Sequence, residues 1–520
     1  MRTRQVATLD FETDPFKHGR IPEPFCAGIY TEGDVIESYQ DWWNDDPEEL
    51  ARDVAEYLAP RRWRVYAHNG GKFDFFFLLP YADKIKGING RIASMQIGRC
   101  LLVDSYLILP VPLRSYGKTD IDYNKMEREH RDKNRDEILA YLRDDCVNLY
   151  QWVTEFRELF GTPLTLASAS FAQMKERGIE IEKHRGESWD EKFRVYYYGG
   201  RCENFDSGVF NGPYSYIDIN SAYPFAMLSE HPSGTEFERV EFLPTDGTPY
   251  FATISGHSRG ALPVRTRGGL SFPHGLGTYH ATSWEIEAGL DTGTLDIDDV
   301  IECYVPFDTQ DFAPFINHFY SERLKAKAAK DASKTLFYKL VMNAGYGKFA
   351  LNPREFKDYA ILECGDWPDG EGWEINYEIG EHSIFSKPDP GDSFYNVCTA
   401  ASITGYVRAY LWRAINDCAG VLYCDTDSIV CRDYGSLRTG KSLGEWEQEA
   451  TIKKAWLGGK KLYALETDDG YKTASKGSNL TVEQIKRVVN GEIVNWPSEA
   501  PTFSLNRAPS FVDRRIKRTA

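Results

Sequence analysis

The hydrophobic and polar positions of the chain divide it into segments of different periodicity. Residues 1–160 alternate strand-like and helix-like patterns, and Asp-rich turns with Gly and Pro clusters punctuate 205–300. Helical patterns cover about 312–343 and about 396–417. Residues 353–395 are rich in Gly, Pro, Asp and Trp and lack helical periodicity, which predicts an inserted loop or hairpin. The pattern as a whole predicts a mixed α/β protein.

Length and composition indicate a globular protein of several domains. The chain has 520 residues, 42% of them hydrophobic and 27% charged, and one core rarely serves so long a chain. The ten cysteines are scattered without a CxxC pair, which argues against a structural zinc site or a disulfide framework. The N-terminal residues lack the apolar region of a signal peptide, and no apolar run approaches the ~20 residues of a membrane helix. We therefore expect a cytoplasmic protein.

The net charge of −17 argues by itself against a nucleic-acid partner. Charge is unevenly distributed, however: residues 323–339, 452–461 and 514–520 are basic, whereas acidic side chains concentrate in 362–381. Each basic run taken singly is most simply a solvated face. Because the local field steers a polyanion, a basic channel inside an acidic shell is compatible with nucleic-acid binding.

Two acids interrupt a strand-like apolar segment in GVLYCDTDSIVC, residues 420–431. On a strand, Asp425 and Asp427 would share one face, where their carboxylates repel each other and lose hydration unless a divalent cation lies between them. The alternative is a tight exposed turn, in which this sequence is ordinary turn chemistry. The stretch alone supports both readings about equally, and its apolar flanks favour a hairpin with the acids at its tip.

Another acid follows an apolar strand in YSYIDINSAYPFAM, where Asp218 precedes a turn containing Ser221 and Pro224. An Asp at a strand end is common and is weak evidence when taken singly. Placed beside Asp427, Asp218 would complete a site for two Mg²⁺ ions about 3.5–4 Å apart, the arrangement that serves phosphoryl transfer. Few carboxylates suffice, because Mg²⁺ keeps several waters and binds substrate phosphates.

The helical pattern in SKTLFYKLVMNAGYGKFA places Lys339, Asn343 and Tyr346 on one face. On such a face a lysine can hold a triphosphate and a tyrosine can stack on a base. Taken alone, the segment is more simply an amphipathic helix without a ligand.

A further group of acids lies near the N-terminus. The strand-like VATLDFETD puts Asp10 and Glu12 on one face, the Gly-rich turn of YAHNGGKFDFFFLL carries Asp74, and the helical DEILAYLRDDCVNLYQW makes Tyr141 and Asp145 neighbours. Four such carboxylates would hold two metal ions that activate water for phosphodiester hydrolysis, with the tyrosine orienting the water. For any single member a solvated acid is the simpler reading, and the joint pattern favours a site.

Taken in order, these segments resemble the motifs of family B DNA polymerases. Three resemble its exonuclease motifs: DFE (10–12), NGGKFD (69–74) and YLRDD (141–145). Three resemble its polymerase motifs A, B and C: DINSAYP (218–224), KLVMNAGYG (339–347) and YCDTDS (423–428). Two shorter segments resemble its Tyr-x-Gly-Gly and Lys-x-Tyr motifs: YYGG (197–200) and KLY (461–463). Eight motifs in the family's order over nearly the whole chain make the resemblance specific.

The resemblance implies an α/β multidomain fold, in which an RNase H-like exonuclease domain precedes a right-hand polymerase of palm, fingers and thumb. The compact length is typical of the protein-primed branch, whose two insertions engage terminal protein (between motifs A and B) and aid strand displacement (between B and C). The expected divisions are 1–165 (exonuclease), 166–229 (linker and first palm part), 230–314 (first insertion with palm parts), 315–351 (fingers), 352–395 (second insertion), 396–475 (second palm part) and 476–520 (thumb).

For the polymerase site, the resemblance implies that Asp218 and Asp427 are the principal metal ligands, with Ile219 at the same metal site and Asp425 as a supporting carboxylate. Tyr223 would stack under the sugar and exclude ribonucleotides by its bulk. The other nucleotide-binding positions that the resemblance implies are Ser221, Lys339, Asn343 and Tyr346.

For the exonuclease site, the resemblance implies metal binding by Asp10, Glu12, Asp74 and Asp145 and catalytic roles for Tyr141 and Lys125. The implied DNA contacts are Asn69, Phe73 and Ser105 for the frayed strand, Tyr197, Gly199 and Gly200 for the template, and Lys461 and Tyr463, on one face of a strand, for the primer. The chain departs from the family where Ala344-Gly345 replaces Ser-Leu and where Tyr106 replaces the Leu after Ser105.

We therefore expect a monomeric DNA-dependent DNA polymerase with a 3′→5′ proofreading exonuclease, which replicates a linear viral or plasmid genome in the cytoplasm of a bacterial host. Its expected ligands are primer–template DNA, dNTPs, a terminal protein primer and two Mg²⁺ per active site, with Mn²⁺ as a substitute. Three alternatives stay open: the same polymerase with ordinary primers, a nuclease whose C-terminal half only binds DNA, and a non-enzymatic replisome clamp or scaffold. Asp218, Asp427 and Lys339 argue against the nuclease, and the retention of all seven acids singled out above argues against the clamp or scaffold.

Overall fold

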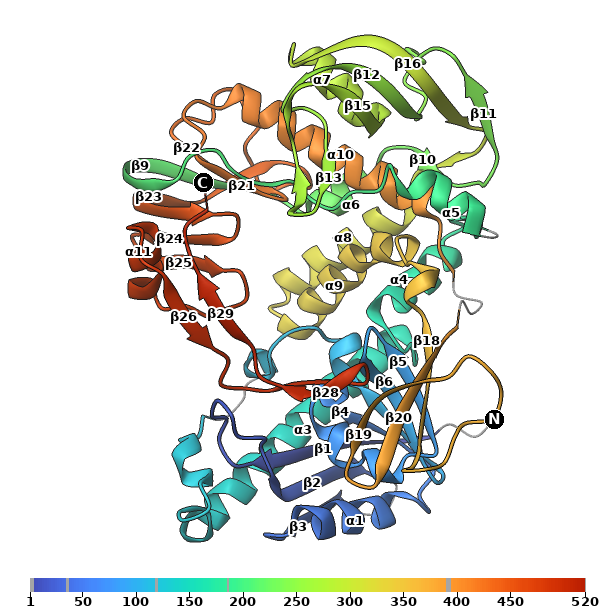
Figure 1. Cartoon of the computed structure of the whole chain (residues 1–520), viewed down its shortest axis with the longest axis vertical. Helices are drawn as coiled ribbons and strands as arrows, with labels where there is room; N and C mark the ends of the chain where they lie inside the picture. Colours follow the sequence, from blue (N-terminus) through green and yellow to red (C-terminus); the bar gives the residue numbers. More distant parts are fainter. Residues whose placement is uncertain (1–3, 34–36, 117–119, 185–186, 390–393, 520) are drawn as a thin grey trace.

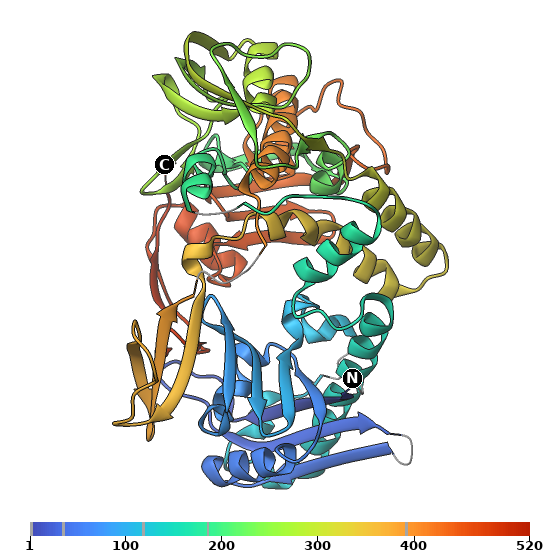
Figure 2. The same ribbon diagram turned by 90° about the vertical axis from the view of Figure 1, so that its right-hand side faces the viewer.

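The computed structural model describes residues 4–33, 37–116, 120–184, 187–389 and 394–519. Two large sheets dominate these residues (Figure 1). The N-terminal sheet, blue with an orange extension, lies at the bottom of the view, and the sheet built from green and red strands lies above it. Figure 2 shows the same division after a quarter turn, with the helices of residues 313–349 beside the upper sheet.

The N-terminal sheet has ten strands in the order β19-β20-β18-β5-β6-β7-β4-β1-β2-β3. β1 is parallel to β4 and β4 to β7, and the other pairs are antiparallel. The strands are β1 (Gln5–Thr13), β2 (Pro24–Glu32), β3 (Glu37–Trp43), β4 (Trp63–Ala67), β5 (Lys84–Ile88), β6 (Arg91–Ile97), β7 (Cys100–Asp104), β18 (Lys357–Glu363), β19 (Glu374–Ile379) and β20 (His382–Pro388).

Helices cover this sheet because each buries an apolar stripe against it. α1 (Pro47–Leu58) is capped by Asp46 and buries Leu50, Val54 and Leu58. The long α3 (Arg135–Phe160) contacts β1 and β2. Short helical turns connect the strands: α2 (Asp74–Phe77), η1 (Gly70–Lys72), η2 (Leu79–Tyr81), η3 (Ser105–Leu107), η4 (Leu113–Tyr116), η5 (Tyr123–Met126) and η6 (Arg131–Asn134).

The second sheet has seven strands in the order β25-β24-β23-β9-β22-β21-β8. Buried apolar residues of its strands form one large core cluster with those of α10 (Val397–Asp417). Asn396 caps the N-terminus of this helix. The strands are β8 (Cys202–Asn204), β9 (Gly208–Ile219), β21 (Tyr423–Asp425), β22 (Ser428–Cys431), β23 (Trp446–Gly459), β24 (Leu462–Thr467) and β25 (Gly470–Ser475).

Between β9 and the helices that follow, the chain forms a separate antiparallel unit. Its four strands have the order β11-β16-β12-β15, and α7 (Ser283–Asp291) packs against α10. The strands are β11 (Phe237–Val240), β12 (Phe251–Arg259), β15 (His274–Thr282) and β16 (Leu295–Pro306). Small neighbours are α5 (Glu187–Arg194), α6 (Ala222–Ala226), and the strand pairs β10 (His231–Pro232) with β17 (Thr309–Gln310) and β13 (Val264–Thr266) with β14 (Gly269–Ser271).

The helical pattern expected over 312–343 is two helices rather than one. α8 (Ala313–Ala328) ends before Lys330, whose φ of 57° is left-handed, and α9 (Ala332–Phe349) begins after Asp331. The Asp331 carboxylate accepts a hydrogen bond from the Lys334 amide at 3.0 Å, so a new N-cap interrupts the periodicity. α4 (Leu166–Glu176) packs against α9.

The segment expected as a loop or hairpin at 353–395 contains the turn η7 (Pro353–Glu355) and then the strands β18, β19 and β20. The hairpin is confirmed, but it does not stand alone. Tyr359 pairs with Ile85, which joins β18 to β5 and extends the N-terminal sheet. The sequence could not show this, because the pairing joins residues more than 250 positions apart.

The C-terminal residues also reach the N-terminal sheet. α11 (Val482–Val489) packs on β23, and two strand pairs follow: β26 (Val494–Pro497) with β29 (Asp513–Ile516), and β27 (Thr502–Ser504) with β28 (Arg507–Ser510). The Leu505 amide donates to the Gly90 carbonyl at 2.8 Å, and Asn376 donates to the Leu505 carbonyl at 2.8 Å. The C-terminal hairpin thus contacts both β18–β20 and the earlier strands (Figure 1).

Candidate active sites

The acids of residues 420–431 lie at the tip of a hairpin, as the apolar flanks predicted. β21 ends at Asp425, β22 begins at Ser428, and the turn between them contains Thr426 with a left-handed φ of 61°. The Asp427 amide donates to the Asp425 carbonyl at 2.7 Å. Burial of the strands on both sides holds two carboxylates at the end of an apolar hairpin.

Asp218 lies beside this tip because β9 pairs with β22. Ser428 is opposite Asp218, and the Ile219 amide donates to the Asp427 carbonyl at 2.8 Å. Two segments more than 200 residues apart thus bring Asp218, Ile219 and Asp427 together, as the resemblance implied.

The protonation of these carboxyls reflects their burial and their mutual repulsion. Burial, with the carboxylates of Asp427 and Glu449, raises the pKa of Asp218 to about 7. Burial, with the carboxylate of Asp425, raises the pKa of Asp427 to about 6. The positive charge of Lys339 lowers both pKa values and so partly offsets these effects. A divalent cation would relieve this repulsion, so the residues present fit a metal site.

Lys461 faces the same acids but does not share a strand face with Tyr463. Its φ is 53°, and it lies in the turn that precedes β24. From there its Nζ forms an ion pair with Asp425 Oδ2 at 3.2 Å. Tyr463 lies on β24, buried, with its ring centroid 5.1 Å from that of Tyr423. The left-handed turn explains the difference, because it breaks the strand alternation between the two residues.

The expected nucleotide-binding residues come from α6, its N-cap and α9. The rings of Tyr223 and Tyr346 are stacked, with centroids 4.1 Å apart and planes at 13°. On α9, Asn343 donates to the Lys339 carbonyl at 2.8 Å. Ser221 has a left-handed φ of 56° and accepts a hydrogen bond from Arg323 at 3.4 Å. The stacked tyrosines thus join α6 to α9.

The departure at Ala344-Gly345 has a packing reason. A Cβ at Gly345 would collide with the side chain of Met174 on α4. Glycine therefore lets α9 approach α4 closely.

At the N-terminal site, Asp10, Glu12 and Asp145 offer ligand oxygens that all lie within 4.8 Å of one another. Alternation on β1 brings the first two together, and α3 delivers the third. Asp74 lies next to them, where its Oδ1 accepts a hydrogen bond from the Phe11 amide at 3.0 Å. Burial raises the pKa of Asp74 to about 7. Clustered oxygens of this kind suit divalent metal ions.

A cavity of about 970 Å³ opens onto these acids. The predicted residues that line it are Asp10, Glu12, Asn69, Phe73, Asp74 and Tyr141. The Tyr141 hydroxyl lies 3.3 Å from that of Tyr123, and burial with the Glu12 and Asp145 carboxylates raises the pKa of Tyr141, which keeps the phenol protonated.

Two of the residues expected at this site, Lys125 and Ser105, are not among those that line the cavity. Lys125 pairs with Glu137 at 2.6 Å. Ser105 is fully buried and donates to the Ala67 carbonyl at 3.1 Å, whereas Tyr106 lines the cavity.

The sequence missed one wall of this cavity. Residues 499–503 line it, and the Phe503 ring lies 5.8 Å from that of Phe73. Lys72 donates to the Phe503 carbonyl at 3.2 Å. Nothing in the local sequence signals this contact, because it joins the two ends of the chain.

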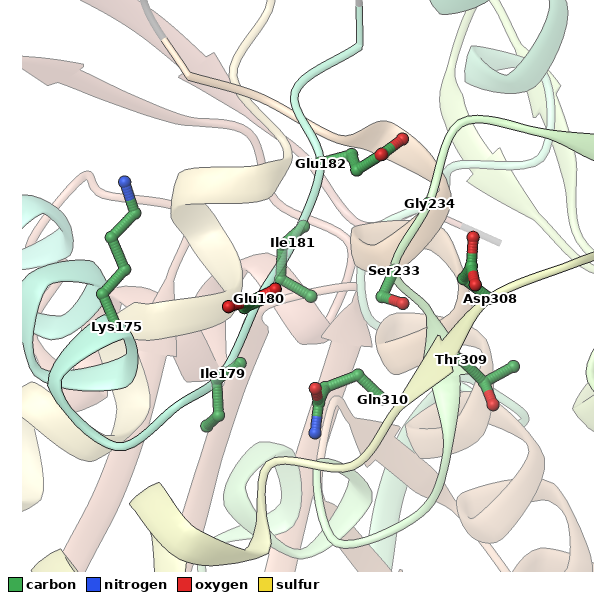
Figure 3. Close-up of a pocket in the computed structure, with 10 residues that line it drawn as sticks. All are labelled: Lys175, Ile179, Glu180, Ile181, Glu182, Ser233, Gly234, Asp308, Thr309 and Gln310. Atoms are coloured by element: carbon green, nitrogen blue, oxygen red, sulfur yellow. The ribbon is translucent and has the colours of Figure 1, made fainter.

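A separate cavity of about 640 Å³ lies where the turn after α4 meets β10 and β17 (Figure 3). Lys175, Glu180, Glu182, Ser233 and Asp308 are among its lining residues, and the lining includes none of the residues assigned above to either site. Within the described residues, no helix is long and apolar enough to cross a membrane.

Comparison with known proteins agrees with this geometry. Residues 117–371 match the model of the family described as DNA polymerase type B, organellar and viral. The DNA-directed DNA polymerase of Enterobacteria phage PRD1 is 40% identical, in an alignment covering 99% of this chain and 98% of that protein. A probable DNA polymerase of Agaricus bitorquis is 24% identical over 87% of this chain and 71% of its own.

Among solved structures, Phi29 DNA polymerase superposes with a TM-score of 0.76 at 17% identity, over 99% of this chain and 100% of that one. Its complex with primer–template DNA and incoming nucleotides superposes with a TM-score of 0.70 over both whole chains. The expected multidomain α/β fold is thereby confirmed. The chain belongs to the type B DNA polymerases of organelles and viruses and is a DNA-directed DNA polymerase.

Proposed function

We propose that the Asp218–Asp427 site joins deoxynucleotides to a primer strand, and that the Asp10–Glu12–Asp145 site removes nucleotides from its 3′ end. The observation that carries the first assignment is the register that sets Asp218 beside Asp427 at the end of a buried hairpin. The cluster of carboxylate oxygens within 4.8 Å carries the second.

In the polymerase site, Asp218 and Asp427 hold two divalent ions, Mg²⁺ with Mn²⁺ as a substitute, and Asp425 supports them. Such ions, when bound, stabilise the attacking and leaving oxygens of an in-line displacement. Lys339 brings a positive charge near both acids, which suits a triphosphate. Tyr346 must leave its stack on Tyr223 before a nucleoside can enter.

In the exonuclease site, Tyr141 donates its phenolic proton to orient the attacking water, and the Phe11 amide fixes the Asp74 carboxylate. Asn69 and Phe73 line the cavity where the frayed 3′ end enters. Lys125 reaches the site only by releasing Glu137, from which it lies 2.6 Å.

We also infer that a terminal protein supplies the first priming hydroxyl in a bacterial host. Support comes from the 40% identity to the PRD1 polymerase and from the four-stranded unit between Asp218 and Lys339, the place of the first insertion of the protein-primed branch. The divisions expected from the sequence follow the same scheme: exonuclease to 165, fingers 315–351 and thumb from 476, with primer–template DNA running between them.

Primer extension tests the polymerase assignment. The parent chain with Mg²⁺ and dNTPs should extend a primed template, and Asp218→Asn should not. Extension by Asp218→Asn would contradict the metal assignment.

Transfer of a labelled dNMP to a candidate terminal protein then tests priming. Extension of nucleic-acid primers without any such transfer would favour a polymerase that uses ordinary primers.

A further inference from the structure

Arg408 on α10 is almost completely buried and makes three hydrogen bonds. Its Nε donates to Glu285 Oε1 at 2.7 Å, and its Nη1 donates to the carbonyls of Tyr198 at 2.6 Å and Gly199 at 2.9 Å. The side chains of Arg408 and Glu285 are 2% and 1% exposed. Among the described residues, Arg408 Nη2 has no hydrogen-bond partner, so the three hydrogen bonds of Nε and Nη1 are what offset the desolvation cost of this buried ion pair.

Glu285 is itself held by α7. Its Oε2 accepts hydrogen bonds from the Thr282 amide at 3.1 Å and from the Thr282 hydroxyl at 2.9 Å, as part of a capping box. Arg408 therefore bridges a fixed carboxylate of the four-stranded unit and two main-chain carbonyls of the segment 198–204, which we call the strap.

The other end of the strap lies against the turn that carries the catalytic acids. The Thr426 amide donates to the Arg201 carbonyl at 2.6 Å, and Cys202 pairs with Asp425 where β8 runs along β21. A Cβ built on Gly200 would lie 2.7 Å from Thr426 Oγ1 and 2.8 Å from its Cγ2. The strap thus contacts the turn through a hydrogen bond, a strand pairing and a close packing contact.

We propose that Arg408 is a positioning residue for nucleotide incorporation: with Glu285 it fixes the strap, and the strap orients the turn that carries Asp425 and Asp427. The turn needs such support, because Thr426 adopts a left-handed conformation that is unfavourable for a non-glycine residue. The proposal rests on the polymerase assignment made above and adds to it a residue that touches neither metal nor substrate.

The same pair of helices offers a matched control. Arg413, one and a half turns beyond Arg408 on α10, pairs with Asp291 of α7 at 2.6 Å, but both side chains are well exposed, at 38% and 60%. This ion pair also joins α10 to α7 and does not reach the strap. Exposed pairs of this kind contribute little to stability.

The first test compares Arg408→Lys with Arg413→Lys. Lysine keeps the charge but cannot reproduce the fork of donors. Arg408→Lys should lower kcat for incorporation by about tenfold or more, raise the half-saturating Mg²⁺ concentration several-fold and change KM for dNTP by less than about twofold. Arg413→Lys should match the parent in all three. Degradation of single-stranded DNA, measured on the same preparations, should stay at the parental rate in both variants.

Equal kcat and Mg²⁺ dependence in the two variants would overturn the proposal. A parent chain that incorporates no nucleotide would instead overturn the polymerase assignment, so the two failures are distinguishable. Loss of exonuclease activity in Arg408→Lys would mean that this variant does not fold, and the second test then decides.

The second test is a double-mutant cycle between Gly200 and Thr426. Gly200→Ala should lower kcat, because the new methyl group pushes Thr426 and the adjoining acids. In a Thr426→Ala background the same change should cost much less, because both atoms nearest the new Cβ are gone. An equal fold-loss in both backgrounds would show that the strap does not act through the turn and would overturn the proposal.

Discussion

The two carboxylate sites of this polymerase differ in how complete they are without substrate. In the N-terminal site, Asp10, Glu12 and Asp145 already bring ligand oxygens within 4.8 Å of one another, and Asp10 and Glu12 line a cavity. At the second site, strand pairing brings Asp218 next to the segment that carries Asp427, Asp425 forms an ion pair with Lys461, and the rings of Tyr223 and Tyr346 are stacked on each other.

This contrast follows from the two reactions. Hydrolysis needs a metal site that is ready when any frayed 3′ end arrives, so the protein supplies most of the ligands. Synthesis has to wait for a nucleotide, and Mg²⁺ binds readily to a few carboxylates together with substrate phosphates. We therefore propose that substrate completes the Asp218–Asp427 site, whereas the fold alone brings the N-terminal carboxylates together.

The largest effect that would sharpen this comparison is the loss of a ligand from the preassembled cluster. Glu12→Gln should lower 3′→5′ degradation on the order of 10³-fold or more, because the cluster loses one of three negative ligands. Synthesis on a primed template should be retained, and mismatches should accumulate in the product. Degradation of single-stranded DNA and sequencing of products measure the two effects. If Glu12→Gln degraded DNA at the parental rate, Glu12 would not be a ligand of the site.

A smaller effect is expected from the neighbouring phenol. Tyr141→Phe keeps the ring but removes the proton that orients water, so hydrolysis should fall about 10²-fold while KM for single-stranded DNA stays near that of the parent. Tyr123→Phe is the matched control, because it removes the hydroxyl 3.3 Å from that of Tyr141 and leaves the Tyr141 phenol in place. If Tyr141→Phe and Tyr123→Phe lowered the rate of hydrolysis equally, the contact between the two hydroxyls, rather than the Tyr141 proton itself, would be responsible.

Metal binding without DNA tests the contrast in assembly. Titration of Mn²⁺ followed by electron paramagnetic resonance should show binding to the parent that Glu12→Gln removes and that Asp427→Asn leaves intact. Adding primer–template and a dNTP should produce further binding that Asp427→Asn removes. Binding of equal affinity at both sites without substrate would contradict the contrast.

The smallest expected effect concerns stability and pH. Because the pKa of Asp218 is raised from 3.8 to about 7 in the folded protein, the folded state binds this proton before the unfolded chain does. The charged carboxyl therefore costs stability that is fully expressed above pH 7 and vanishes as the pH falls toward 4. Without metal, Asp218→Asn should raise the free energy of unfolding by about 1–2 kcal/mol at pH 8, after allowance for solvent screening, and by nothing well below pH 4. For a chain of this length the shift in the unfolding midpoint at pH 8 is roughly 1–2 °C.

The exposed Asp469, in the turn between β24 and β25, gives the control for that measurement. Asp469→Asn should leave the midpoint unchanged at both pH values. If Asp218→Asn and the parent had the same unfolding midpoint at pH 8, the charged Asp218 carboxylate would not destabilise the metal-free protein.

The sequence predicted those parts of the sites that depend on local periodicity. Alternation along β1 placed Asp10 and Glu12 together, and apolar flanks placed Asp427 at a hairpin tip. It failed where local geometry is set by one residue, as at Lys461, whose left-handed backbone breaks the strand face shared with Tyr463. A single residue also decides the helix boundary at Asp331, whose side chain caps a new helix and so divides the long helical pattern in two.

Contacts between distant segments could not be predicted from the chain. Phe503 reaches the exonuclease cavity from the other end of the sequence, and Arg408 holds carbonyls more than 200 residues away. Neither residue carries a local pattern that distinguishes it from an ordinary core phenylalanine or a surface arginine. Tertiary packing alone gives them their places.

Synthesis and degradation should belong to two separate carboxylate sites. The direct measurement follows one 5′-labelled primer on a longer template, with Mg²⁺ and increasing dNTP, in the parent, Asp427→Asn and Asp10→Asn. We expect that Asp427→Asn only shortens the primer, that Asp10→Asn only extends it, and that the parent shifts from shortening to extension as the dNTP concentration rises. Loss of both activities from either single substitution, in a protein that remains folded, would contradict it.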